Sequence, residues 1–242
     1  MMRQLGTFAA AAVVAASLSL GGCATAPSGK DYAAFRAEGP RSILVVPALN
    51  NTLNVPAPDY FLSTISRPFA ERGYYVFPAY MVKRVMEDEG LSDAGLVHGA
   101  DASRFNRLFG CDSVLFVTIQ QWDSKYMVIT TQTTVKFDYT LKSCKSGATL
   151  WQESQGLVYS PQSSNSGNPI ADLIAMAVVA AIQKGAPNYI PLAIQANMLA
   201  AGMPGRGLPA GPYQPAQFGK DQAAFSGTAS QRGTTAAAKW LH

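Results

Sequence analysis

Histidine is nearly absent from this chain of 242 residues, because His98 and His242 are the only two. The sequence also contains no Cys-x-x-Cys and no His-x-x-x-His motif, and it therefore lacks the usual ligands of a zinc site. A Ser-His-Asp triad could use only His98, and no Gly-x-Ser-x-Gly motif supplies a nucleophile for it. We therefore expect no bound metal, and we expect His98 to be a solvated loop residue.

Phosphate-binding loops and paired catalytic carboxylates are missing as well. The stretch Gly202-Met-Pro-Gly205-Arg-Gly207 has no strand before it and no helix after it, so it is not a dinucleotide-binding fingerprint. Asp123 and Asp138 lie on or beside strands, but nothing marks them as a glycosidase pair. With no complete reactive constellation, the sequence indicates a protein that is not an enzyme and has no cofactor.

Charged residues are also scarce, since Asp, Glu, Lys and Arg make up only 14% of the chain. The formal net charge is +4, and no run of five or more like charges occurs. This mild, dispersed excess argues against nucleic acid as a partner. The low charge suggests that part of the surface is buried against another protein.

What the chain does have is an apolar leader that ends at a cysteine. Only Arg3 is charged before residue 21, and the apolar run 8–20 fits a signal-peptide core of roughly 7–15 residues. Gly21-Gly22-Cys23 then resembles the lipobox of bacterial lipoproteins. We predict that residues 1–22 are removed and that Cys23 carries a diacylglyceryl group and an acylated amine. Ala24, in place of the Asp that would signal inner-membrane retention, favours the outer membrane. The alternatives are an ordinary secretory signal or an N-terminal core helix.

Composition divides the rest of the chain into three parts. We expect residues 23–40 to be the acylated cysteine and a tether, residues 41–201 an α/β domain, and residues 202–242 a Gly/Pro/Ala-rich, mostly disordered tail. Apolar runs and period-2 patterns predict strands at 43–46, 74–77, 114–119, 126–141 and 149–159, with a turn at 122–124. Apolar spacing predicts helices at 59–72, with a kink or break at Pro68, and at 80–89, 101–109 and 190–199. This order predicts a sandwich in which helices flank a mixed sheet with an antiparallel meander.

Cys111 and Cys144 are the cysteines that remain after Cys23, and an oxidising periplasm would permit them to pair. If the hairpin turns near Asp123, Cys111 faces a residue near Lys136, well short of Cys144. A disulfide then requires a bend or another strand arrangement, and the sequence leaves the pairing open.

Two stretches are candidates for binding another molecule. Asn50 and Asn51 follow the first strand, at the edge where open α/β sheets tend to place ligands, although such residues also hydrogen-bond their own turn. The segment 170–182 is apolar almost all round and too short to span a bilayer, so it is either a core helix or a self-association face. As a face of a homodimer it would present Leu173, Ile174, Val178 and Ile182.

Several segments together resemble a known family. They are Asp31-Tyr-Ala-Ala-Phe, Pro40-Arg-Ser-Ile-Leu-Val-Val-Pro, Asn50-Asn51, Arg67-Pro68, Gly73-Tyr-Tyr-Val-Phe-Pro78, Leu150-Trp151 and Gly211-Pro212-Tyr213. They are similar to outer-membrane lipoproteins of Gram-negative bacteria, first noted among neisserial surface antigens. The resemblance implies a fold like the TolB N-terminal domain, CsgG-type secretion lipoproteins and the lipoprotein activators of peptidoglycan synthases. It implies envelope partners, among them a CsgG-like lipoprotein and a small lipoprotein, and no catalytic residues.

Taken together, these observations predict a lipid-anchored outer-membrane protein that faces the periplasm. We expect it to act without catalysis, as a protein-binding or assembly accessory subunit of an envelope or secretion complex. The alternatives are a cell-wall hydrolase, which would gather Asp, Glu, Ser or His side chains in a pocket, and a CsgG-like pore component.

Overall fold

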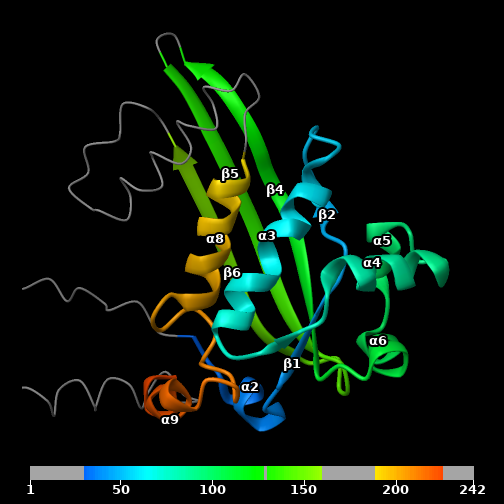
Figure 1. The fold of residues 1–242 in the computed structure, drawn as a ribbon, viewed down its shortest axis with the longest axis vertical. Helices are drawn as coiled ribbons and strands as arrows, with labels where there is room; N and C mark the ends of the chain where they lie inside the picture. The colour runs from blue at the N-terminus through cyan, green and yellow to red at the C-terminus, as the bar shows by residue number, and fades with distance from the viewer. Residues whose placement is uncertain (1–29, 128–129, 160–188, 226–242) are drawn as a thin grey trace, which may run out of the picture.

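The structure is a computed structural model that describes residues 30–127, 130–159 and 189–225 (Figure 1). Its helices are α2 (Ala33–Glu38), α3 (Ala57–Glu71), α4 (Ala79–Asp88), α5 (Ala94–Gly99), α6 (Ala102–Phe109), α8 (Ile190–Gly202) and α9 (Pro215–Ala224). Its strands are β1 (Ser42–Val45), β2 (Leu49–Asn50), β3 (Tyr75–Val76), β4 (Ser113–Met127), β5 (Thr130–Ser143) and β6 (Thr149–Tyr159).

The strands form one mixed sheet of six, in the order β3-β1-β4-β5-β6, with β2 also paired to β4. β1 lies parallel to β3 and β4, and β2 also runs parallel to β4. β4, β5 and β6 form an antiparallel meander. The predicted α/β class with a mixed sheet and flanking helices is therefore confirmed.

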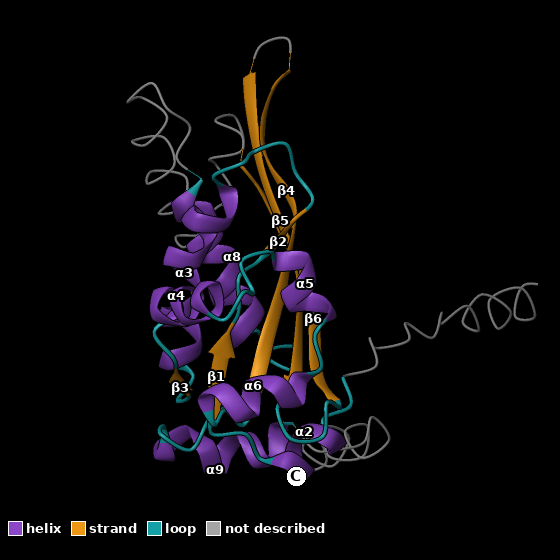
Figure 2. Ribbon diagram, turned by 90° about the vertical axis from the view of Figure 1, so that its right-hand side faces the viewer, coloured by secondary structure: helices purple, strands orange, loops and turns teal. Residues whose placement is uncertain are grey.

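Alternating side chains of the strands build a separate apolar core on each face of the sheet. Ile43 and Leu115 contribute to the core beneath α3 and α8, whereas their neighbours Leu44 and Val114 contribute to the core beneath α4, α5 and α6. In Figure 2, α3 and α8 lie to the left of the strands and α5 and α6 lie over them, while the β4–β5 hairpin extends beyond the helices.

The hairpin does not turn at residues 122–124 as the sequence suggested. β4 continues to Met127, because a register shift between Ile119 and Gln121 absorbs one residue and lets the pairing with β5 resume. Trp122 consequently lies inside the strand, opposite Val135, and is almost fully buried.

The ends of the predicted domain also differ. Tyr32 and Phe35 are buried, so the tether predicted for residues 23–40 is already part of the domain by residue 30. The sequence predicted a mostly disordered tail for residues 202–242, but residues 202–225 are packed, with Leu208 and Phe225 buried and α9 folded. Both segments are packed because they form hydrogen bonds with residues far away in the sequence, and composition does not predict such contacts.

A kink or break was predicted at Pro68, and α3 runs through this residue without a break. Pro68 is itself buried and lies near the end of the helix, so packing retains the helical path after the loss of one backbone hydrogen bond. The predicted helix 170–182 lies outside the described residues.

Candidate functional site

A polar cavity of about 510 Å³ opens at the carboxyl end of β2. It lies between the loop that joins β2 to α3 (residues 51–56), the middle of β4, and Tyr189 at the start of α8. Its lining residues are Asn51, Thr52, Leu53, Asn54, Gln120, Gln121, Trp122, Asp123, Ser124 and Tyr189. The cavity therefore lies at the edge of the sheet where the sequence placed the candidate asparagines.

Asn50 shapes this loop instead of facing a ligand. Its Oδ1 accepts hydrogen bonds from the Thr52 backbone N–H at 3.1 Å and from Thr52 Oγ1 at 2.8 Å. Its Nδ2 donates to the carbonyl oxygen of Asn54 at 2.9 Å. Asn51 reaches across to β4, where its Nδ2 donates to Gln120 Oε1 at 3.3 Å. The two predicted residues are thus adjacent, but only Asn51 lines the cavity.

Two residues of the cavity carry buried polar atoms that have no hydrogen-bond partner. They are Trp122 Nε1, a donor, and Asn54 Oδ1, an acceptor. Each such atom costs about 1–3 kcal/mol relative to a satisfied one. The indole ring of Trp122 is fixed by Tyr189, whose ring centroid lies 5.5 Å away. With one free donor and one free acceptor, the cavity is suited to neutral hydrogen-bonding groups.

Large apolar side chains project into solvent from the same loop. Leu53 is fully exposed and Val55 is 85% exposed, while Tyr60 on the first turns of α3 is half-exposed. Covering these side chains with another molecule would be favourable, because it would remove their apolar surface from water. These residues were not predicted from the sequence, although apolar residues between Asn51, Asn54 and Pro56 in a turn-forming stretch are a detectable signal.

The lining of the cavity offers little for bond breaking. Its carboxylate, Asp123, lies 3.6 Å from the ammonium group of Lys125, and no histidine lines it. Within the described residues, no three side chains of His, Cys, Asp or Glu are grouped so as to hold a metal ion. The arrangement is suited to binding.

His98 is not the solvated loop residue that the sequence suggested. It lies in α5, where its ring packs against Phe116 with centroids 5.2 Å apart, and its Nε2 donates to the carbonyl oxygen of Pro47 at 3.0 Å. Burial lowers the pKa of the imidazole below its ordinary value. The ring is a packed structural group, positioned by residues distant in the sequence.

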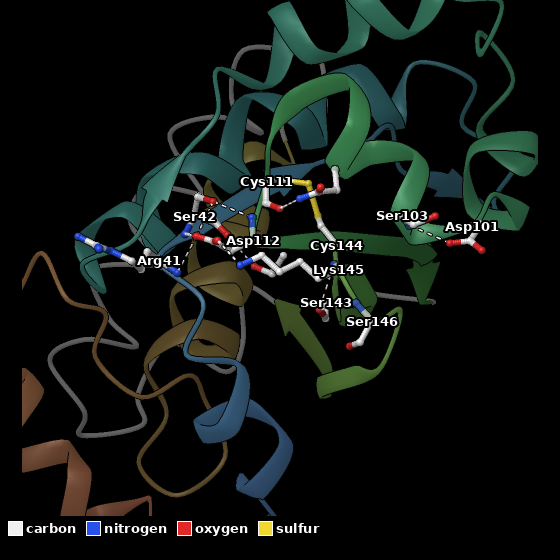
Figure 3. Close-up of a disulfide and its surroundings, with 12 residues drawn as sticks. Arg41, Ser42, Asp101, Ser103, Cys111, Asp112, Ser143, Cys144, Lys145 and Ser146 are labelled. Atoms are coloured by element: carbon white, nitrogen blue, oxygen red, sulfur yellow. Dashed lines mark hydrogen bonds and ion pairs between the residues drawn. A yellow bond between two sulfur atoms is a disulfide. The ribbon is translucent and has the colours of Figure 1, made fainter.

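The structure joins Cys111 and Cys144 in a disulfide, with their Cα atoms 6.0 Å apart (Figure 3). The observed register pairs Ser113 with Ser143, which brings the flanking cysteines to the same end of the sheet. Beside them, Asp112 accepts hydrogen bonds from the Ser42 backbone at 3.1 Å and from Ser42 Oγ at 3.0 Å, as Figure 3 shows. The bridge thus fastens the start of β4 to the turn after β5.

A buried carboxylate outside the cavity, that of Glu153, forms ion pairs that stabilise the fold. Glu153 on β6 pairs with Lys30 and with Arg206, whose Nη2 lies 2.5 Å from Glu153 Oε1. These contacts tie the first and the last described segments to the sheet.

The remaining predicted site residues cannot be placed. Cys23 and the possible interface residues Leu173, Ile174, Val178 and Ile182 lie outside the described ranges. Within those ranges, no helix combines the length and apolar composition needed to cross a membrane.

Comparison with known proteins identifies the family. The family model described as "Putative lipoprotein GNA1162-like" matches residues 30–213. "Putative lipoprotein NMB1124/NMB1162" of Neisseria meningitidis serogroup B is 34% identical over 155 residues, which are 64% of this chain and 72% of that protein. The crystal structure of lipoprotein GNA1162 from Neisseria meningitidis has a TM-score of 0.50 and 32% identity, and the match covers 60% of this chain and 99% of that chain.

A weaker match is the PelC dodecamer from Paraburkholderia phytofirmans, with a TM-score of 0.38 and 18% identity over 68% of this chain and 91% of that chain. The family model covers most of the described domain, and the neisserial lipoprotein supports the same assignment over most of its own length. The chain therefore belongs to the GNA1162-like family of lipoproteins.

Proposed function

We propose that this protein is anchored to the outer membrane by acyl chains on Cys23 and that its domain faces the periplasm. There it binds another protein of the envelope and acts as a non-catalytic accessory subunit of an envelope or secretion complex. The observation that carries the binding role is the exposure of Leu53 and Val55 beside a polar cavity. The family assignment supports the anchor, since the family is described as a lipoprotein.

The surface formed by residues 51–56 and the polar cavity has the chemistry of a protein interface. Leu53 and Val55 supply apolar area, and burying each one contributes about 1.5–3 kcal/mol to association. Next to them, the amides of Asn51 and Gln120 supply hydrogen bonds, which give an interface its register. A partner segment with apolar side chains and free backbone amides satisfies both parts of the surface.

A cell-wall hydrolase is the alternative from another class. It requires a nucleophile or an acid–base pair in a pocket. The cavity at the end of β2 has Ser124 next to Asp123, but Ser124 Oγ lies 2.8 Å from Thr133 Oγ1, within hydrogen-bond distance, and His98 is packed elsewhere. This arrangement favours binding over hydrolysis.

The binding surface can be tested by placing a photo-crosslinking amino acid at position 53 in intact cells. We expect a discrete adduct at position 53 that disappears when Val55 is also changed to Asp, because a charge in the apolar patch opposes desolvation. The matched control is the same amino acid at position 96, since Leu96 is also exposed but lies on α5. No adduct at 53, or the same adducts from 53 and 96, would contradict the proposal.

The mass of the adduct identifies the partner. A second copy of this chain would double the mass, as expected for a homodimer, whereas a CsgG-like lipoprotein or a small lipoprotein would add its own mass. Unfolding measurements on Val55→Asp check that a lost adduct reflects binding: since Val55 is exposed, its free energy of unfolding should change by less than about 0.5 kcal/mol.

A further inference from the structure

A second pocket, of about 380 Å³, lies at the opposite end of the molecule, between α2 and α9. Both helices lie at the end away from the β4–β5 hairpin in Figures 1 and 2. The pocket, called here the arginine pocket, is lined by Phe35, Arg36, Gly39, Pro40, Arg41, Tyr74, Ala210, Gly211, Pro212 and Phe218. It combines aromatic and proline walls with two guanidinium groups.

Arg36 is half-buried and is held in the pocket by neutral groups. Its Nη2 donates to the carbonyl oxygen of Asp221 at 2.9 Å, and its Nε donates to the carbonyl oxygen of Phe225 at 3.4 Å. The carboxylate of Asp221 is occupied elsewhere, since its Oδ2 accepts from Arg72 and from the Ala210 backbone N–H, each at 2.7 Å. The charge of Arg36 is thus partly shielded from water without a carboxylate in direct contact, and this burial lowers its pKa.

Arg41 is exposed at the mouth of the same pocket. Its guanidinium lies 5.9 Å from the ring centroid of Tyr213, and its backbone N–H donates to Asp112 Oδ2 at 3.2 Å. Within the part of the chain that the structure describes, neither guanidinium forms an ion pair. Two guanidinium groups without an ion pair at one pocket favour an anion with several oxygen acceptors, and phosphate offers such acceptors to the N–H groups of Arg41 and to those that Arg36 does not use on Asp221 and Phe225.

The neutral part of the pocket indicates what the anion is attached to. Phe35, Pro212 and Phe218 form walls that gain nothing from a free inorganic ion, but they can pack against hydrocarbon. The position of the pocket near the predicted membrane anchor indicates which molecule carries the anion. Lys30 is seven residues from Cys23, so an extended tether keeps it within about 25 Å of the acylated cysteine. Helix α2 begins just after Lys30.

We infer that the arginine pocket binds the headgroup phosphate of a membrane phospholipid, with Arg36 and Arg41 contacting the phosphate and the aromatic walls contacting the adjoining glycerol and acyl carbons. Anion binding follows from the pocket alone, whereas the choice of a membrane lipid as its source rests on the anchor of the proposed function. Lipid bound here would orient the domain, with the loop 51–56 directed away from the membrane.

The test is native mass spectrometry of the full chain in mild detergent, titrated with phosphatidylglycerol or with phosphatidylcholine. We expect one phosphatidylglycerol adduct per chain and weaker retention of phosphatidylcholine, whose choline screens the phosphate. Arg36→Gln and Arg41→Gln should each weaken the phosphatidylglycerol adduct by about tenfold, as expected for the loss of a charge-assisted contact. The matched control is Arg104→Gln, an exposed arginine on α6, which should leave the adduct unchanged.

Arg36→Gln could also loosen α9, because Arg36 donates hydrogen bonds to Asp221 and Phe225. Arg41→Gln avoids this problem, because the Arg41 side chain is exposed and its loss should not disturb the fold. Unchanged adducts in Arg41→Gln would overturn the inference, and so would equal loss in Arg104→Gln. Displacement of the lipid by inorganic phosphate at similar concentration would show a free-anion site and overturn the lipid assignment. The same spectra report the covalent mass on Cys23, so failure of the anchor is distinguishable from failure of this pocket.

Discussion

At the scale of single residues, a buried hydrogen-bonded chain connects the sheet to the helices above it. Tyr139 on β5 donates to Asn197 Oδ1 at 2.6 Å, and Asn197 Nδ2 donates to Thr64 Oγ1 at 2.8 Å. All three side chains are almost fully buried, so water cannot replace a lost partner. The chain of contacts fixes α3, α8 and β5 relative to one another.

Tyr139→Phe should therefore lower the free energy of unfolding by about 1–3 kcal/mol, because it leaves Asn197 Oδ1 buried without a donor. Urea denaturation measures this change. Tyr213→Phe is the matched control, since Tyr213 is 58% exposed, and it should have an effect below about 0.5 kcal/mol. Equal effects in the two variants would show that the buried contact contributes nothing specific.

His98 should make stability depend on pH. Its pKa in the folded protein lies below the ordinary value, so the unfolded chain binds more protons as the pH falls through about 6.5. Acidification from about pH 7.5 to about pH 5.5 should therefore lower the free energy of unfolding, and His98→Gln should weaken that dependence. Denaturation series at several pH values measure it, and parallel curves for the two proteins would contradict the prediction.

Local sequence predicted some of these residues and not others. The helix predicted at 101–109 is confirmed as α6, and its N-cap residue Asp101 accepts through Oδ1 from the Ser103 backbone N–H at 2.8 Å. The cap involves neighbours in the chain. The prediction for His98 was wrong because the contacts that bury it come from Pro47 and Phe116, which no local pattern connects to it.

At the scale of elements, the segment 206–213 shows how distant donors can order a stretch rich in glycine and proline. The carbonyl oxygens of four consecutive residues accept side-chain hydrogen bonds: Arg206 from Trp151 at 2.8 Å, Gly207 from Tyr32 at 2.6 Å, Leu208 from Arg72 Nε at 3.1 Å, and Pro209 from Tyr74 at 2.7 Å. Composition alone predicts a disordered tail here, because none of these donors is nearby in sequence.

Gly211→Ala should detach this segment. A methyl group at position 211 would overlap the carbonyl oxygen of Gly73, whereas one at Gly219 in α9 meets nothing within 4 Å. We expect Gly211→Ala to cost about 1–3 kcal/mol and to speed tryptic cleavage after Lys220, while Gly219→Ala should be neutral or stabilising by up to about 1 kcal/mol. Faster cleavage in Gly219→Ala, or an unchanged cleavage rate in Gly211→Ala, would contradict the prediction that the contact of Gly211 with Gly73 holds this segment in place.

The meander shows the limit of strand prediction. Its three strands could be predicted from apolar runs and period-2 patterns, but the turn was placed too early because Trp122-Asp123-Ser124 has a turn-like composition. The register shift after Ile119 is set by pairing with β5, and the open question of the disulfide depended on that register. The sequence of one strand does not specify which residues of the neighbouring strand it pairs with, so the register could not be predicted.

At the scale of the whole molecule, two differently built surfaces lie at opposite ends. One end carries the exposed Leu53 and Val55 beside the polar cavity, and the other carries the arginine pocket near the first described residues. The fold class could be predicted because element order and alternation are properties of the sequence. Neither cavity could be, since each is assembled from segments that meet only in the folded chain.

We propose that a lipid-modified cysteine holds this domain at the envelope, and the binding roles proposed for its two ends depend on that anchor. The most direct measurement is the intact mass of the mature chain extracted from membranes, together with fractionation of Cys23→Ala. We predict a chain that begins at Cys23 with a diacylglyceryl group and an amide-linked acyl chain, and release of the Cys23→Ala protein from membranes. A mature chain without lipid, or Cys23→Ala protein that is retained in the membrane as fully as the wild type, would contradict the account.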